Sequence, residues 1–255
     1  MELVVLVVWK RKPCVMSAMK VIQANCRVQF TSEDVRWVID TLSKNDKDSA
    51  SLASLLQDPD SLDVLLDDER LLQALLDDHS CLRVSQHFYF YVMVRHVLRR
   101  SGLDDRRVAD YVAELLAEFS LTERTRCRLP GSDVSLDYFF EMLAALQTVD
   151  DRTAFCLRTQ IGNQSLFMSG LFLERIRHRA ETRGFPDLSY YEQLGQANFR
   201  VAGDHRLARR YSLDGIFHTL SEQFEAVRKA LNDLAERILF LGDARFAGIR
   251  PSASN

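Results

Sequence analysis

Two sets of residues have the types and the spacing that metal chemistry requires. Asp214, His218 and Glu222 follow one another at four-residue intervals, and Glu174 and His178 repeat that interval earlier in the chain. Residues four apart lie on one face of an α-helix, so each set places its ligand-type side chains in a row. Rows of carboxylates and histidines on facing helices hold two iron or manganese ions in helical bundles. One interpretation of the sequence is therefore an iron or manganese site between two helices.

The spacing resembles that of the haem-oxygenase-like di-iron oxidases, and the resemblance covers these five positions alone. It implies a helical-bundle metalloprotein of the oxidase type. The Glu-x-x-His pair of ferritin-like bundles, however, occurs nowhere in the chain. Asp110 and Glu114 share the four-residue spacing and show how often such pairs arise, and pairs at this spacing also stabilise exposed helices. The metal site is therefore the alternative interpretation.

A ten-residue repeat, SLASLLQDPD, SLDVLLDDER and LLQALLDD, occupies residues 51–78. Each copy carries L-x-x-L-L, which is typical of a short helix followed by a turn. We expect the leucines to fill the core of this protein, with docking of a leucine helix into a partner's groove as the alternative. The other face carries eight carboxylates against Arg70 alone. It is either solvated or a docking surface for a basic partner, formed by Asp58, Asp63, Asp67, Asp68, Asp77 and Asp78.

Two groups of arginines provide positive charge. Arg95, Arg99 and Arg100 lie on the polar side of a predicted helix at 86–100 and could bind a phosphate or carboxylate. Because the acidic repeat precedes them in the chain, internal salt bridges are the favoured interpretation.

Residues 172–210 hold the second group and suggest a nucleic-acid groove with Tyr190 and Tyr191 as stacking partners. The net charge of −3 and the absence of a lysine cluster disfavour this second alternative. Its arginines are Arg175, Arg177, Arg179, Arg183, Arg200, Arg206, Arg209 and Arg210.

The remaining composition excludes several classes of protein. The chain contains no G-x-S-x-G, P-loop, G-x-G-x-x-G or H-E-x-x-H motif. Five scattered cysteines without a C-x-x-C pair predict neither a disulfide framework nor a zinc knuckle, and they fit a reducing cytoplasm. The excess of 27 Arg over 6 Lys is typical of bacterial-type base composition. The seven apolar residues 3–9 are too few to span a bilayer.

Ten Gly and five Pro are few for 255 residues and favour long helices over sheets. We predict an all-α fold, an irregular bundle of about eight to ten helices. Short stacked helices at 51–78 precede longer C-terminal ones, including 133–149, 150–183 and 193–241. The helix at 86–100 is apolar almost all round, which predicts a central position. Gly162 and Gly170 predict close approach of neighbouring helices.

The chain ends carry separate predictions. Residues 1–18 are interpreted as a non-native or disordered extension, with Met19 as the true start, and a short buried strand is the alternative. Residues 19–245 are expected to form one domain, with a possible division near 129–132, and 246–255 to form a tail. We expect a non-enzymatic cytoplasmic protein that binds another protein through its acidic N-terminal face and its arginine-rich C-terminal region. This interpretation requires no cofactor, whereas the metal alternative requires iron or manganese.

Overall fold

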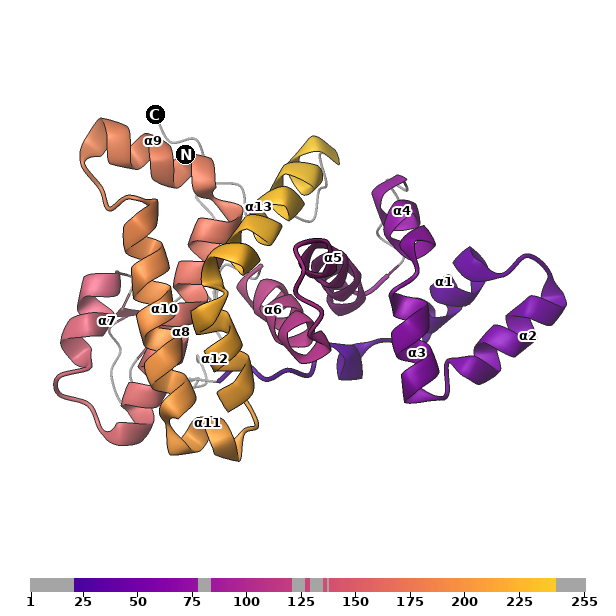
Figure 1. The fold of residues 1–255 in the computed structure, drawn as a ribbon, viewed down its shortest axis with the longest axis horizontal. Coiled ribbons are helices and arrows are strands. Elements are labelled where there is room, and N and C mark those ends of the chain that lie inside the picture. Colours follow the sequence, from indigo (N-terminus) through magenta and orange to yellow (C-terminus); the bar gives the residue numbers. More distant parts are fainter. Residues whose placement is uncertain (1–20, 78–83, 121–126, 129–134, 137, 242–255) are drawn as a thin grey trace, which may run out of the picture.

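Helices dominate the protein. A computed structural model describes residues 21–77, 84–120, 127–128, 135–136 and 138–241. These residues form thirteen α-helices, a 3-10 turn and a pair of two-residue strands (Figure 1). In chain order the elements are η1 (Arg27–Gln29), α1 (Ser32–Leu42), α2 (Asp46–Leu55), α3 (Pro59–Leu66), α4 (Glu69–Asp77), α5 (Gln86–Arg100), α6 (Arg106–Phe119), β1 (Cys127–Arg128), β2 (Ser135–Leu136), α7 (Phe139–Ala145), α8 (Asp151–Leu171), α9 (Leu173–Arg183), α10 (Leu188–Asp204), α11 (Arg206–Arg210), α12 (Asp214–Glu222) and α13 (Phe224–Leu241).

The all-α prediction is confirmed, with more helices than the eight to ten expected. No helix in the described part of the chain is both long and apolar enough to cross a membrane. The predicted extension at 1–18, the division near 129–132 and the tail at 246–255 lie outside the described residues, as does Asp78. The division of the chain into domains therefore stays a prediction.

The leucine repeat forms three short helices, α2, α3 and α4. Asp58 caps α3 by accepting a hydrogen bond from the Ser61 amide at 2.8 Å, and Pro59 follows at the first helical position. Burial increases along the repeat, because Leu55 is 46% exposed whereas Leu75, at the same place in the third copy, is 3% exposed. The prediction that the leucines fill this protein's own core is confirmed for α4 and only partly for α2.

The helix α5 lies at the centre of the molecule. Figure 1 shows α5 and α6 between the short helices α1–α4 and the C-terminal helices α8–α13. Every residue of α5 from Phe88 to Leu98 is buried, as predicted from its apolar circumference. One connected set of buried side chains runs from Ile22 to Leu234 through this helix. The N-terminal layer and the C-terminal helices therefore share α5 and α6 as their common packing surface.

The C-terminal part is more divided than predicted. The expected helix at 150–183 breaks at Phe172, whose backbone leaves the helical region (φ −125°, ψ 36°), and becomes α8 and α9. The segment 193–241 belongs to four helices, α10 to α13. Gly184 ends α9 in the left-handed conformation at φ 63°, where glycine carries no steric cost. The predicted end of the helix at 183 is therefore correct, whereas the break at Phe172 and the divisions within 193–241 were not predicted.

The expected helix at 133–149 is wrong in its first part. Residues 135–136 pair with 127–128 as short antiparallel strands, and only α7 is helical. Two-residue strands are too short to show an alternating pattern, so the sequence could not indicate them. Met142 on α7 packs with Leu157 and Ile161 on α8 in a second, smaller buried cluster.

The helix caps link elements that are distant in the chain. Thr31 and Asp34 form a capping box at the start of α1. Asp34 is buried and also accepts hydrogen bonds from the backbone amide and hydroxyl of Ser85, both at 2.6 Å. Ser85 in turn caps α5. Asp187 caps α10 by accepting a hydrogen bond from the Tyr190 amide.

Candidate functional site

The structure does not bring the five predicted metal ligands together. Glu174 and His178 are exposed on α9, where Glu174 pairs with Arg177 at 2.8 Å. On α12, His218 lies 3.5 Å from Asp204, and Glu222 is exposed. Figure 1 shows α9 apart from α12.

Across the described residues, no group of three or more histidines, cysteines or acids is close enough to hold a metal ion. Four-residue spacing aligned Asp214 with Glu222 as expected, but it could not orient α9 and α12 toward each other. The predicted meeting of these two rows of ligands is therefore wrong.

Asp67, predicted as part of a docking surface, instead points into the protein. Its carboxylate accepts hydrogen bonds from Arg95 Nε at 2.8 Å and from Arg106 at 2.6 Å, and Arg99 lies 3.7 Å away. Arg95 is only 1% exposed and also pairs with Asp104. Asp67 therefore joins α3 to the start of α6 and to the central helix α5.

The electrostatics of Asp67 follow from this position. Partial burial opposes ionisation of its carboxyl group, but the hydrogen bond from Arg95 and the charges of Arg95, Arg106 and Arg99 outweigh burial and lower its pKa. The side chain is consequently a carboxylate at neutral pH. Together with Asp104, it neutralises the buried Arg95.

Other acids of the repeat are paired as well. Asp63 pairs with Arg27 and lies 3.5 Å from Arg106, whereas Asp68 pairs at 2.7 Å with the exposed Arg70. Arg100 pairs with Glu69, which also lies 3.4 Å from His96. Asp67 of the predicted docking surface and the predicted anion-binding arginines Arg95 and Arg99 therefore belong to one network of ion pairs within the protein.

This network leaves little capacity for the predicted binding of a free anion. Arg95, Arg99 and Arg100 already face carboxylates of the repeat, which confirms the internal salt bridges favoured by the sequence. An external phosphate or carboxylate would have to displace these intramolecular partners.

A smaller part of the repeat remains outward-facing. Val64 is 69% exposed, and with Leu55 and Leu65 it lines an open hollow of about 310 Å³ between α2 and α3. Asp60 borders the hollow and forms no ion pair with another described residue. Asp58 lies at the turn between the two helices. Of the predicted acids, Asp77 is also exposed, at the end of α4. An apolar surface with an acidic border is therefore available on α2 and α3.

Sequence reasoning missed a buried polar cluster on α6. Asp110 and Glu114, dismissed as a chance pair, are buried and face the segment before α1. Asp110 accepts a hydrogen bond from the Arg27 amide at 2.9 Å, and Glu114 accepts one from Gln29 at 2.8 Å. Burial raises the pKa of Asp110 despite Arg27. The signal was available, because both acids are flanked by apolar residues in the stretch from Val108 to Ala117.

The eight C-terminal arginines do not form one groove. Four lie on α9 and four lie at or beyond the last turn of α10, at residues 200–210. Figure 1 places α9 and α11 at opposite ends of α10. Because α10 has 17 residues, the two groups are separated by roughly 25 Å of helix. Nucleic-acid binding stays a prediction without a continuous basic surface to support it.

Known proteins do not identify the fold or the site. No family model matches the chain, and no curated protein or solved structure is significantly similar to it.

Proposed function

We propose that the protein is a non-enzymatic interaction module that binds a basic, partly apolar segment of another protein on α2 and α3. The supporting observation is the hollow beside Leu55 and Val64, where apolar side chains that could have been buried remain exposed. Exposed apolar surface bordered by polar residues is typical of interaction sites.

The charge around the hollow selects the partner. From the start of α2 to the end of α4, residues 46–77 carry nine acids against Lys47 and Arg70. Arginines of α5 and α6 neutralise Asp63 and Asp67 from the inner side, whereas Asp58 and Asp60 remain on the outer side. A segment with apolar residues on one face and Lys or Arg beside them would complement this surface.

A peptide titration tests the proposal. The probe is a fluorescein-labelled amphipathic helix of about 18 leucine and lysine residues, with binding followed by fluorescence anisotropy. Changing Leu55 and Val64 together to Ser is expected to weaken binding about tenfold, since each side chain would lose part of its apolar burial. Changing Val201, a residue 45% exposed on α10, to Ser is the matched control and should leave the affinity unchanged.

The charge contribution has its own comparison. Asp60→Asn should weaken binding of the same peptide a few-fold at low salt, and the difference should vanish at high salt because exposed charges are screened. Equal affinities for the wild type and for the Leu55/Val64 double variant would contradict the proposal.

A further inference from the structure

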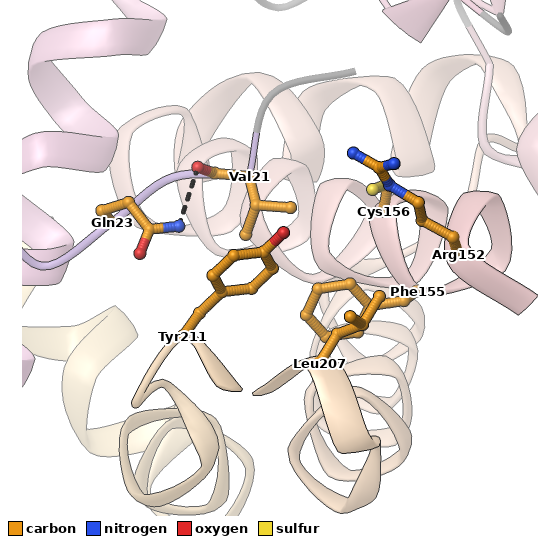
Figure 2. A pocket seen from close by; sticks show the side chains of 7 residues that line it. All are labelled: Val21, Gln23, Arg152, Phe155, Cys156, Leu207 and Tyr211. Carbon is orange, nitrogen blue, oxygen red and sulfur yellow. Dashed lines mark hydrogen bonds between the residues drawn. The ribbon is translucent and has the colours of Figure 1, made fainter. Parts of the chain in front are cut away.

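A second cavity lies on the opposite side of the central helices, between the N-terminal segment, α8 and α11. It has a volume of about 190 Å³. Figure 2 shows four polar side chains, Gln23, Arg152, Cys156 and Tyr211, beside the apolar side chains of Val21, Phe155 and Leu207. Arg152 and Cys156 are four residues apart on α8, so both point to the same face of that helix. None of the described residues that line the cavity lies on α2 or α3.

Arg152 presents a cation without an intramolecular counter-charge among the described residues. Its two acidic neighbours in the chain are otherwise engaged. Asp150 caps α8 and accepts hydrogen bonds from the amides of Arg152 and Thr153 at 2.9 and 3.0 Å. Asp151 turns to α11, where it binds His205 at 3.0 Å and Arg206 at 2.9 Å. The guanidinium of Arg152 therefore retains its capacity to bind an anion.

The other polar groups of the cavity are neutral donors. Burial raises the pKa of Cys156, partly offset by Arg152, so its side chain stays a thiol at neutral pH. The Tyr211 hydroxyl makes no hydrogen bond to another described residue, although Figure 2 shows it directed toward the cavity. None of the described residues that line the cavity carries a carboxylate. The described lining thus combines the positive charge of Arg152 with neutral polar groups.

The cavity is large enough to hold a single ring against its apolar wall. Phe155 is held by stacking on His205, with ring centroids 4.9 Å apart, and the Tyr211 ring lies 6.4 Å from it. A cavity of roughly 150 Å³ accommodates benzene, so the volume here suits one ring or a branched aliphatic chain with a small polar group. A larger ligand would have to extend into solvent.

We propose that this cavity binds a small carboxylic acid with an aromatic or branched aliphatic body. Its carboxylate pairs with Arg152, with the Tyr211 hydroxyl as a second donor, and its apolar body packs against Phe155 and Leu207. A bidentate arginine–carboxylate pair fixes the orientation of such a ligand, and the apolar wall selects it against simple anions.

Benzoate is the probe, with benzyl alcohol as a neutral molecule of similar shape, and binding to the full chain is measured by ligand-observed NMR at constant ionic strength. We expect saturable binding of benzoate and at least tenfold weaker binding of benzyl alcohol. Arg152→Gln should weaken benzoate about tenfold because the charge-assisted bond is lost. Arg175→Gln, an exposed arginine on α9, is the matched control and should bind as the wild type does.

A second measurement locates the ligand. Benzoate should slow the alkylation of Cys156, followed by mass spectrometry of the Cys156 peptide, and should do so less in Tyr211→Phe, which retains the ring and loses the hydroxyl. Circular dichroism shows whether each variant is folded. Should Arg152→Gln prove unfolded, the Tyr211→Phe titration decides, with an expected loss of about threefold. Equal binding of benzoate and benzyl alcohol, unchanged binding in both variants, or unprotected Cys156 would overturn the proposal.

Discussion

Replacing Asp67 by Asn is expected to lower the free energy of unfolding by about 3 kcal/mol at neutral pH. Asp67 accepts hydrogen bonds from Arg95 and Arg106, and Arg95 is 1% exposed. The substitution preserves the size of the side chain but removes its charge, so Arg95 keeps only Asp104 as a counter-charge. Urea denaturation followed by circular dichroism measures the effect.

Asp68→Asn is the matched control. Asp68 is the next residue and also pairs with an arginine, but its partner Arg70 is exposed to solvent. Asn caps a helix as well as Asp does, so the hydrogen bond that Asp68 accepts from the Arg70 amide can be retained. We expect a loss below about 1 kcal/mol. Similar losses for the two variants would show that the Asp67 network contributes no more than a surface pair.

The effect of Asp67 should depend on pH. Its pKa in the folded protein lies below the ordinary value of about 3.9, because Arg95 and the other arginines stabilise the carboxylate. A lowered folded pKa stabilises the protein fully above the unfolded value, and the stabilisation is lost as pH falls through the folded value. The difference between wild type and Asp67→Asn should therefore be constant from about pH 5 to 8 and decrease below about pH 4.

Replacing Gly195 by Ala is expected to lower the free energy of unfolding by about 3 kcal/mol. A Cβ atom at Gly195 on α10 would lie 2.5 Å from Cζ of Phe224 and 3.1 Å from Cβ of Ser165. Phe224 and Ser165 are fully buried, so neither side chain can move into solvent. The added methyl group would force α10 away from α8 and α13. Thermal denaturation should show a clear fall in Tm.

Gly215→Ala, in the same part of the protein, is expected to raise the stability. Gly215 lies in α12, and a Cβ atom there would meet nothing within 4 Å. Ala favours a helix over Gly by about 1 kcal/mol, so this variant should be slightly more stable than the wild type. Equal stabilities for the two variants would contradict the close packing of α10 against Phe224.

Local features of this fold could be predicted because they depend on neighbours in the chain. The capping role of Thr31 with Asp34, the turn at Asp58-Pro59 and the central position of the helix at 86–100 all follow from residue type and spacing. Close approach at Gly162 was predicted in the same way, and a Cβ atom there would meet the Phe199 ring at 2.9 Å.

Contacts between distant elements could not be predicted from spacing. Asp63 and Asp67 share one face of α3, but nothing in the sequence shows that this face meets Arg106 rather than solvent. The link from Asp34 to Ser85 spans 51 residues. The contact of Gly195 with Phe224 joins residues 29 positions apart, and no local pattern around Gly195 identifies that partner. In each case the tertiary partner, and not the local pattern, sets the role of the residue.

These contacts divide the acids of the leucine repeat between two roles. Its acids do not act as one surface, because Asp63 and Asp67 hold the N-terminal layer on α5 and α6. On the outward side, Leu55, Val64 and Asp60 remain exposed. Loss of stability and loss of binding should therefore follow from different substitutions within the same three helices.

Site-specific photo-crosslinking tests this assignment most directly. A benzophenone amino acid is placed at Val64 in the full chain, or at Val201 as the control, and each protein is irradiated with the leucine–lysine peptide. Both positions are exposed, at 69% and 45% respectively. We expect strong crosslinking of the peptide to position 64, decreasing at high salt, and little crosslinking to position 201. Equal crosslinking from the two positions, or none from position 64, would contradict this assignment.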